Sequence, residues 1–457
     1  MAQQHKLWGG AFTKSPGEVA WRFGQSIESD LNLLNEEIEV SIAHAQMLGD
    51  TGIISAQEAA LLAQGLGEVG NDLAGQDLGG FEDVHAAVET GLKAKVGAAA
   101  DKLHSGRSRN DQIATVSRLW LRNRTTQLAE TVRAFQAVLV EQSEKFLNEP
   151  MPGYTHQQPA QPNTLGAWML AHFWMLERDL QRLSSTSEMA MAQCPLGSGA
   201  MAGSTLPIDR ERTSEKLGFG APSASALDGV SDRDYVGDAL HACAMLMQHL
   251  SRFSQEIVLF STAEFGYVRL DDAMSTGSSI MPQKRNPDFA ELIRGRSARA
   301  IGNWVQFMGM MKALPLGYNR DQQDDKPPLF DSVALCMDST VLCKEMLETA
   351  TWNLPRLKEM ATAGFSTATA VAESLVQAGV PFRQAHEAVG RLVLYCEKNG
   401  KTLDQLDAQD AKNLDLPASS LEAATLDGAL RAKKSAGSPG PEALAVQLQQ
   451  AREALNN

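Results

Sequence analysis

Long stretches of the chain repeat apolar residues at the spacing of an α-helix. Residues 108–149 contain neither glycine nor proline, and as one helix they would span roughly 60 Å. Similar patterns cover residues 163–193, 234–265, 288–313 and 329–352. The pattern therefore predicts five long helices in the middle of an all-α protein, in which strand patterns are scarce.

One of these predicted helices carries a heptad-like apolar seam. Its apolar side chains recur at spacings of four, three, four and three residues, at Leu246, Leu250, Phe253, Ile257 and Phe260. Such a seam favours near-parallel packing against other long helices. Other helices carry apolar residues on more than one face, as in WMLAHFWML and AMLMQHL. We therefore expect that bundles from several subunits pack together, with cover by the terminal domains as the alternative.

The two ends of the chain have shorter helical patterns than its middle. A chain of 457 residues is long for one compact core, so more than one domain is expected. Residues 1–107 mix short helical patterns with glycine-containing turns, and the helical patterns shorten again after Pro355. We predict an N-terminal helical domain at 1–107, a central bundle of long helices at 108–355 and a small C-terminal helical domain at 356–457.

Composition describes an ordinary globular protein that is acidic overall. The chain is 43% hydrophobic and 21% charged, with a formal net charge of -14. This charge argues against a nucleic-acid partner, and an anionic substrate would need a local basic pocket. Five widely spaced cysteines without a CxxC pair are typical of buried thiols in a reducing cytoplasm. We expect a cytoplasmic protein without membrane contact, because no apolar signal region or membrane-spanning run is present.

The sequence contains no recognisable signature of a metal or cofactor site. The nine histidines form no HExxH motif, and neither GxGxxG after a strand nor GxxxxGK[ST] occurs. We therefore expect an enzyme of this sequence to work without metal, nucleotide or prosthetic group. Polar residues instead concentrate in segments between the long helices, each of which has a helix cap or turn as its simpler explanation. These segments are HSGRSRNDQ (104–112), GYTHQQPAQP (153–162), PLGSGAMAGS (195–204), TGSSIMPQKRNPD (276–288) and GYNRDQQDDK (317–326).

These segments carry a resemblance to a known family. GSSIMPQKRNPDFAELIRG resembles the GSSxMPxKxNxxxxE signature of the fumarase/aspartase superfamily. LWGGAF, LHSGRSRNDQ, YTHQQPAQP, PLGSGAMAG, VSDRDYV and LGYNRDQQDDKPPLFD are similar to the argininosuccinate lyase family, to which the delta-crystallins are related. The resemblance covers nearly the whole chain, from Leu7 to Gly390. It implies a three-domain fold with a central five-helix bundle, and a homotetramer with a twenty-helix core whose sites each use three subunits.

The resemblance also implies an activity. The family cleaves argininosuccinate to arginine and fumarate in the last step of arginine biosynthesis, by anti β-elimination through an aci-carboxylate carbanion. Such a carbon–nitrogen lyase needs groups that stabilise negative charge and exclude water. Two alternatives stay open: another fumarate-releasing lyase of the superfamily, and a crystallin-like structural homologue.

The family's catalytic residues match positions in this sequence. Its base is the first serine of the loop at 275–288, here Ser278, whose alkoxide Lys284, nearby backbone amides and a helix N-terminus would stabilise. His156 and Glu291 match an imidazole–carboxylate pair, although the identity of the general acid stays open. Arg109 and Lys284 suit the succinyl carboxylates. The other substrate-binding candidates are Ser26, Asn110, Thr155, Asn286, Tyr318, Gln323 and Lys326, with His104 open between a site residue and a buried structural histidine.

Several positions depart from the family pattern. Ala11 stands where arginine is usual, and Ala167 stands where histidine is common. Ser225 and Ala226 replace asparagine and serine, and Arg285 replaces a second lysine. The two alanines at 11 and 167 remove polar groups, which puts support of the site in question, whereas Arg285 keeps the charge.

Overall fold

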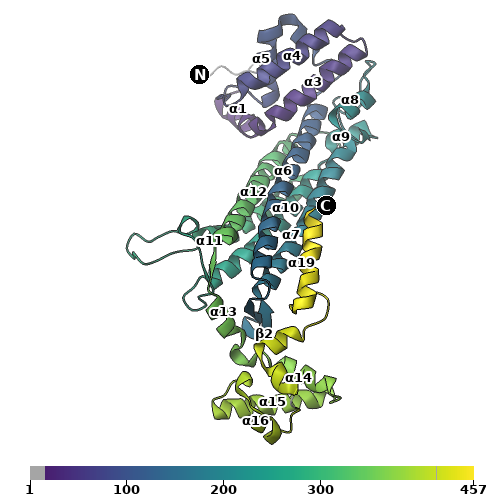
Figure 1. Cartoon of the computed structure of the whole chain (residues 1–457). Helices are drawn as coiled ribbons and strands as arrows, with labels where there is room; N and C mark the ends of the chain where they lie inside the picture. The colour runs from purple at the N-terminus through teal and green to yellow at the C-terminus, as the bar shows by residue number, and fades with distance from the viewer. Residues whose placement is uncertain (1–15, 418, 457) are drawn as a thin grey trace. The chain divides into compact units, whose positions relative to one another are not determined.

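Helices make up almost all of the ordered structure. The computed structural model describes residues 16–417 and 419–456, and within them the chain forms helices and three two-stranded sheets (Figure 1). This confirms the predicted all-α class. The LWGGAF segment, with its departure at Ala11, lies outside the described residues.

The five predicted long helices are present, with ends that differ by a few residues from the pattern. They are α6 (Arg109–Lys145), α7 (Leu165–Ala192), α10 (Asp234–Phe260), α11 (Asp288–Met311) and α12 (Lys326–Thr349). None of the helices within residues 16–417 and 419–456 combines the length and the apolar character needed to cross a membrane.

Shorter elements lie before, between and after these helices. The shorter helices are α1 (Glu18–Gly24), α2 (Ile27–Asp30), α3 (Leu34–Asp50), α4 (Ala56–Leu73), α5 (Val84–Val96), α8 (Arg210–Leu217), α9 (Ala226–Ser231), α13 (Leu354–Ala361), α14 (Ala368–Gln377), α15 (Phe382–Asn399), α16 (Ala408–Asn413), α17 (Ser419–Ala424), α18 (Leu426–Arg431) and α19 (Pro441–Leu455). The strand pairs are β1 (Pro150–Thr155) with β2 (Gln158–Thr164) and β5 (Val268–Arg269) with β6 (Thr351–Trp352), both antiparallel, and β3 (Gln193–Cys194) with β4 (Ala221–Pro222), parallel. The short 3₁₀ helices include η3 (Asp272–Met274) and η4 (Arg320–Asp325).

The chain divides into two compact units that are interleaved in sequence. The first contains the described residues of Met1–Glu130, Asp179–Met247 and Arg296–Met337, and the second those of Thr131–Arg178, Gln248–Gly295 and Asp338–Asn457. Each long helix contributes residues to both units. The predicted three-domain division follows different boundaries and stays a prediction.

Packing in the first unit joins short helices to sections of the long ones. Helix α4 begins with a capping box, in which the Ser55 side chain accepts the Glu58 N–H while the Glu58 side chain accepts the Ser55 N–H, satisfying two otherwise unpaired donors. Between α6 and α12, the rings of Trp120 and Phe330 lie 4.4 Å apart. Ring pairs of this kind contribute beyond their area.

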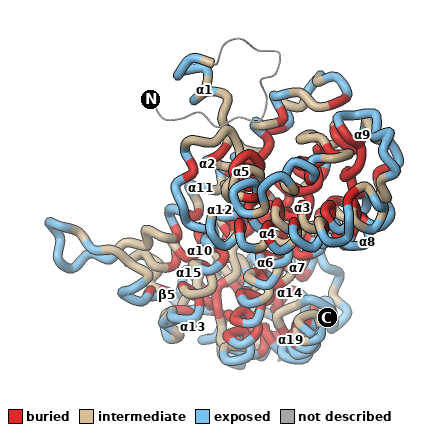
Figure 2. The backbone as a smooth tube through the Cα atoms, turned by 90° about the horizontal axis from the view of Figure 1, so that it is seen from above, coloured by how far each residue is buried: buried red, intermediate tan, exposed pale blue. Residues whose placement is uncertain are grey.

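The second unit contains an aromatic cluster around Trp168. Its ring centroid lies 5.8 Å from that of Phe253 and 5.5 Å from that of Trp352, and Phe135 meets Phe253 edge-on at 5.5 Å. Phe253 belongs to the predicted heptad seam of α10, and all five residues of that seam are buried (Figure 2). The seam prediction is thereby confirmed.

All five cysteines are buried and none forms a disulfide. Burial raises the pKa of Cys194 to about 11 and that of Cys343 to about 12. Both thiols therefore stay protonated near neutral pH and pack as small apolar groups, which confirms the expectation of buried thiols.

Gly166 tests how tightly the end of α6 packs on the start of α7. A Cβ atom here would lie 2.8 Å from Leu147 Cα and 2.9 Å from the Ser143 carbonyl oxygen. Because both are backbone atoms, Gly166→Ala should lower the free energy of unfolding by about 1–3 kcal/mol, measured by thermal or denaturant unfolding. Gly67→Ala in α4 is the matched control, since nothing lies within 4 Å of its Cβ position. Unchanged stability of Gly166→Ala would contradict this packing.

Candidate active site

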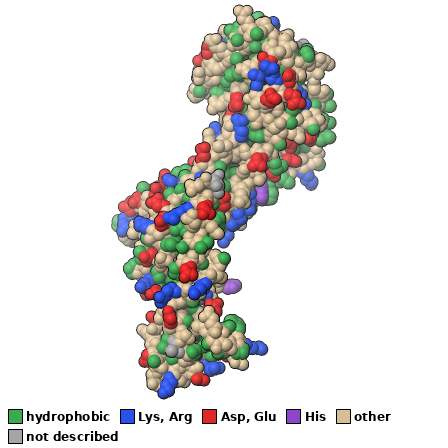
Figure 3. Space-filling model, turned by 45° about the vertical axis from the view of Figure 1, so that its right-hand side comes forward, with side chains coloured by type: hydrophobic (Ala, Val, Ile, Leu, Met, Phe, Trp, Pro, Cys, Tyr) green, Lys and Arg blue, Asp and Glu red, His purple; other side chains and the backbone are tan. Residues whose placement is uncertain are grey.

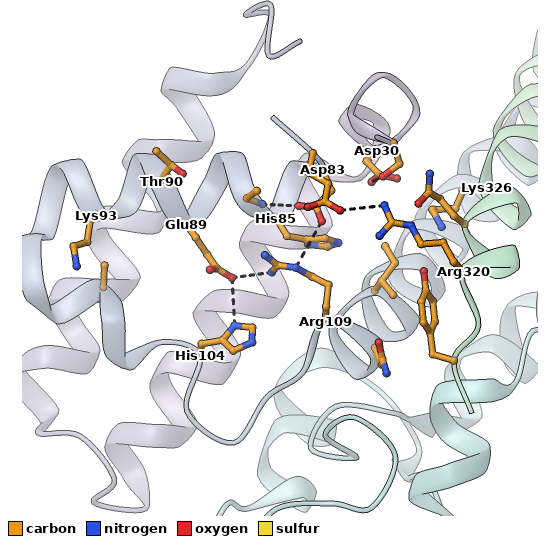
Figure 4. Close-up of a pocket in the computed structure, with 18 of the residues that line it drawn as sticks. Asp30, Asp83, His85, Glu89, Thr90, Lys93, His104, Arg109, Arg320 and Lys326 are labelled. Atoms are coloured by element: carbon orange, nitrogen blue, oxygen red, sulfur yellow. Dashed lines mark hydrogen bonds and ion pairs between the residues drawn. The ribbon is translucent and has the colours of Figure 1, made fainter. Parts of the chain in front are cut away.

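A cavity of about 990 Å³, lined mainly by polar and charged residues, lies in the first unit (Figure 4). Its wall is formed by residues of α2, α5, η2 (Gly97–Lys102), the start of α6, η4 and the start of α12, together with loop residues beside them. Six of the twelve predicted site residues line it: Ser26, Arg109, Asn110, Tyr318, Gln323 and Lys326.

The buried carboxylate of Asp111 holds the first turn of α6 in place. Its Oδ1 accepts the Ser108 N–H at 2.8 Å, and its Oδ2 accepts the N–H groups of Gly197 and Gly199 at 2.9 and 2.8 Å. Burial raises the pKa of Asp111, against the effect of these three donors. This one side chain therefore joins the HSGRSRNDQ and PLGSGAMAGS segments, which are distant in sequence.

The two predicted binding residues of this turn are already engaged within the chain. Arg109 Nη1 donates to Glu89 Oε1 at 2.7 Å, and its Nε lies 3.7 Å from Asp83 Oδ2. The side-chain amide of Asn110 donates to the Ala200 carbonyl at 3.0 Å. The charge of Arg109 is thus balanced by two carboxylates, and its predicted role toward the substrate stays a prediction.

Ser26 is oriented by an aspartate that the sequence reasoning missed. Its hydroxyl donates to Asp30 Oδ2 at 2.5 Å. Asp30 is only 2% exposed, and its Oδ1 accepts no hydrogen bond from the described residues. Burial raises the pKa of Asp30, although the nearby Lys326 opposes the shift. One feature of the sequence could have indicated this pair: Ser26 and Asp30 are four residues apart, which places their side chains on one helical face.

Lys326 is a buried cation at the wall of the cavity. Its Nζ donates to Asp325 Oδ1 at 2.9 Å. Burial acts to lower the pKa of Lys326, but Asp325 and Asp30 outweigh it and raise the pKa. Tyr318 lies beside it, and burial raises the pKa of its phenol. The cavity therefore presents an ammonium and a neutral hydroxyl side by side.

A fully buried imidazole–carboxylate pair also reaches the cavity. His85 Nδ1 lies 2.6 Å from Glu37 Oε2, while Glu37 Oε1 accepts from Gln112 at 2.5 Å and Ser41 at 2.8 Å. Burial acts to raise the pKa of Glu37, but His85, Arg107 and the hydrogen bonds hold it below its ordinary value. The sequence analysis did not select Glu37 or His85, because these partners lie 48 residues apart and belong to no common motif.

His104 lines the cavity and is not a buried structural histidine. Its side chain is 46% exposed, and Nδ1 lies 3.3 Å from Glu89 Oε1. The structure therefore excludes the buried alternative for this residue.

The other six predicted site residues belong to the second unit: Thr155, His156, Ser278, Lys284, Asn286 and Glu291. The GYTHQQPAQP segment, expected to be irregular, forms the β1–β2 hairpin. Thr155 pairs with Gln158, so His156 and Gln157 form a two-residue turn with φ values of 53° and 58°. A left-handed conformation at both positions is that of a type I′ turn, which is uncommon without glycine or asparagine. His156 is thus fixed at the exposed tip of a hairpin.

Ser278 lies on the loop that leads into α11. Its Oγ accepts hydrogen bonds from the backbone N–H groups of Ile280 and Met281 at 3.3 and 3.1 Å. At the base of the loop, Thr276 and Asn286 exchange two backbone hydrogen bonds of 3.1 and 2.8 Å. The loop is therefore closed at its base and has N–H groups directed at the serine oxygen.

The charged residues of this region are largely exposed. Arg285, whose role the sequence left open, pairs with Asp272 of η3 at 2.9 Å. Glu291 lies 3.6 Å from Arg294 on the next turn of α11. Within the described part of one chain no ion pair joins Glu291 to His156, so the predicted pairing stays a prediction.

The departures at 167 and 225 fall at helix starts. The Ala167 N–H donates to Thr164 Oγ1 at 3.1 Å in the first turn of α7. Ser225 caps α9, since its side chain accepts the Asp228 N–H at 3.3 Å, and Ala226 is the first residue of that helix. Ser225 thus retains a capping role.

Charged side chains of both signs occur on the surface and in the cavity of the first unit. Acidic and basic side chains are interspersed on the face shown in Figure 3. The cavity itself is lined by Asp30, Glu82, Asp83, Glu89 and Asp101 as well as Lys93, Arg109, Arg320 and Lys326. It is therefore not simply the basic pocket that an anionic substrate would require, but suits a ligand that carries charges of both signs.

The family models and the relatives that match this chain all indicate the same protein family. A lyase family model matches residues 10–302, and a model of the argininosuccinate lyase C-terminal segment matches residues 365–436. An argininosuccinate lyase of Pelotomaculum thermopropionicum is 45% identical, over 98% of this chain and 99% of that protein. One of Carboxydothermus hydrogenoformans is 44% identical, over 98% and 100%.

Solved structures share the fold. An EDDS lyase in complex with formate has a TM-score of 0.85 and 27% identity, covering 97% of this chain and 91% of that chain. A class II fumarase from Schistosoma mansoni has a TM-score of 0.74 and 18% identity, covering 88% and 90%. The second likeness shows the fold alone.

His44 makes the segment beside the cavity sensitive to acid. It is fully buried, its Nε2 lies 3.0 Å from the Ser105 carbonyl oxygen, and burial together with Arg107 lowers its pKa to about 3. The unfolded chain binds a proton near pH 6.5, so stability is complete above that pH and falls as the pH drops toward 3. At pH 5 the expected loss is about 2 kcal/mol.

The measurement is the unfolding free energy at pH 7 and pH 5 for the wild type and His44→Gln. The variant should be less stable at pH 7 but should lose less on acidification. An equal pH dependence in both proteins would show that His44 does not titrate in this way.

Proposed function

Because the chain belongs to the argininosuccinate lyase family, we infer that it cleaves argininosuccinate to arginine and fumarate. The observation that carries this conclusion is identity of 45% over nearly the full length, together with the family's own C-terminal segment. The reaction is the last step of arginine biosynthesis, and we place it in the cytoplasm.

The reaction requires a base, groups that stabilise negative charge, and a proton donor. A proton must leave the carbon beside a carboxylate, and the resulting carbanion is stable only as a doubly charged aci-carboxylate. Expulsion of the guanidinium nitrogen then requires a proton donor. Preformed N–H donors and cations placed where charge develops lower this barrier more than the same groups in water, so the loop and hairpin of the second unit are the segments of interest.

We propose Ser278 as the base that removes this proton. A serine hydroxyl is a weak base unless its alkoxide is stabilised. Support comes from the N–H groups of Ile280 and Met281, which donate to Ser278 Oγ at 3.3 and 3.1 Å. Lys284 adds positive charge to the same loop, and Asn286 stands at its hydrogen-bonded base. These two residues are proposed to meet the substrate's carboxylates when the loop covers the site.

His156 and Glu291 are proposed to act as a pair across the assembled site. The tip of the hairpin presents His156 to solvent in a strained turn, and such outliers concentrate at functional sites. Thr155 precedes it at the end of β1. Because the ion pair of Glu291 found among the described residues of its own chain is with Arg294, the pair with His156 is proposed to form between subunits.

The cavity of the first unit is proposed to bind the arginine part of the substrate. This part carries a guanidinium, an ammonium and a carboxylate, which matches the mixed charge of the lining. Asp30 offers a carboxylate oxygen without a partner among the described residues, and Lys326 offers an ammonium. Ser26, Asn110, Tyr318 and Gln323 supply further hydrogen-bonding groups on the same wall.

A homotetramer with sites shared by three subunits completes the proposal. Support comes from α11, where Ile301, Val305 and Met308 follow one another on one face at spacings of four and three residues. Their side chains are 42%, 60% and 54% exposed. An apolar helix face of this kind is typical of a surface that another chain covers.

The first experiment tests both the lyase activity and the role of Ser278 as the base. Purified protein given argininosuccinate should release fumarate, followed by its ultraviolet absorbance, and should release none from adenylosuccinate, aspartate or malate. Ser278→Ala should assemble normally and lose about 10²–10⁴-fold in kcat, whereas the neighbouring Ser279→Ala serves as control and should stay within a few-fold of wild type. Absence of turnover in the wild type would leave the crystallin-like alternative, and full activity of Ser278→Ala would remove Ser278 as base.

The second experiment tests assembly. Val305→Glu places a charge on the apolar face of α11 and should dissociate the tetramer and abolish activity, because burying an unpaired carboxylate is strongly unfavourable. Leu61→Glu in α4 is the control, since Leu61 is also exposed, at 44%. Light scattering after size exclusion gives the masses. A tetramer that survives Val305→Glu would move the interface away from this face.

A further inference from the structure

We propose that Arg233 and Asp325 are positioning residues that fix the charged Lys326 side chain at the wall of the cavity. The proposal rests on the proposed function, in which Lys326 binds the substrate. Neither Arg233 nor Asp325 lines the cavity, so both act through Lys326.

The three side chains form a buried chain of alternating charge in the first unit. Arg233 Nε donates to Asp325 Oδ2 at 2.6 Å, and Lys326 Nζ donates to Oδ1 of the same carboxylate at 2.9 Å. Arg233, Asp325 and Lys326 are 2%, 1% and 3% exposed. One carboxylate thus bridges two cations, with one oxygen for each.

The position of Lys326 makes a counter-charge necessary. It is the first residue of α12 and is only 3% exposed, and burial favours the neutral amine. Asp325 immediately precedes Lys326 and opposes this effect, and the nearby Asp30 opposes it as well. The lysine therefore keeps its charge in a place that would otherwise remove it.

Arg233 in turn fixes the carboxylate. Its Nη1 donates to the carbonyl oxygens of Asp232 and Val230 at 2.7 and 3.3 Å, at the end of α9. A guanidinium is planar with donors in fixed directions, so these two bonds determine where Nε points. Asp325 is consequently held from one side by Arg233, and its remaining oxygen is directed at Lys326.

A purely structural role does not explain this arrangement well. Well-packed apolar side chains often join the same elements with equal or greater stability, because they avoid the desolvation of charges. The chain of charges instead ends at the cavity. The Lys326 ammonium has three N–H donors; among the described residues Asp325 accepts one, and the Gln322 carbonyl lies 3.5 Å away. A donor is left for a carboxylate of the ligand.

Steady-state kinetics with argininosuccinate test the proposal in Asp325→Asn and Arg233→Lys. Asp325→Asn should raise KM about 10-fold or more with a smaller change in kcat. The high-pH limb of kcat/KM should also move to lower pH, because Lys326 loses its counter-charge. Arg233→Lys keeps the charge but loses the planar geometry, and should change KM in the same direction by less.

Arg133→Lys is the control. Arg133 pairs with Glu177 at 2.9 Å and does not line the cavity. It should lower the melting temperature without moving KM or the pH profile. If Asp325→Asn and Arg233→Lys behave like this control, the chain of charges is structural and the proposal is overturned.

A second readout does not depend on turnover. Trace labelling of amines with acetic anhydride over a range of pH, followed by peptide mass spectrometry, gives the pKa of Lys326 in each protein. The pKa should fall in Asp325→Asn relative to wild type and should not change in Arg133→Lys. If the Lys326 pKa falls in Asp325→Asn but the wild type does not turn over argininosuccinate, the proposed function is rejected and the positioning role is not. An unchanged Lys326 pKa in Asp325→Asn would reject the positioning role.

Discussion

The carboxylate of Asp111 is the interaction on which the geometry of the cavity depends. It accepts three backbone N–H groups from two segments that lie more than eighty residues apart, with Gly197 and Gly199 at separations of 86 and 88. Such a bridge satisfies donors that would otherwise be buried without partners. Because Asp111 lies in the first turn of α6, it fixes Arg109 and Asn110 at the same time.

Much of the fold could be predicted because its causes are local. The five long helices follow from apolar spacing and from the absence of glycine and proline, both of which are read within one segment. The seam of α10 was likewise predicted correctly, residue by residue. The β1–β2 hairpin was not, because its strands contain Pro150, Pro152, Pro159 and Pro162, which are rare in strands except at edges. Both strands of a two-stranded sheet are edge strands, so this sheet tolerates the prolines.

The residues that line the cavity were predictable where they belong to a sequence motif, but not where they are identified only by a partner distant in sequence. Ser26 and Lys326 belong to recognisable segments, and both line the cavity. Asp30, Glu37 and His85 were missed because their significance depends on burial and on partners distant in sequence. Glu37, for example, contacts His85 and Gln112 at separations of 48 and 75 residues. One sequence without its fold does not reveal which acidic residues are enclosed.

Under the proposed role of Ser278 as base, the two backbone hydrogen bonds between Thr276 and Asn286 have a consequence for turnover. Bringing the ends of a flexible loop together costs conformational entropy. Here the ends are joined in the folded chain, so this entropy is lost once, during folding, and not again in each catalytic cycle. The segment between them is a short closed ring, inside which the N–H groups of Ile280 and Met281 donate to Ser278 Oγ. The surroundings of this oxygen are therefore held by contacts within the loop itself.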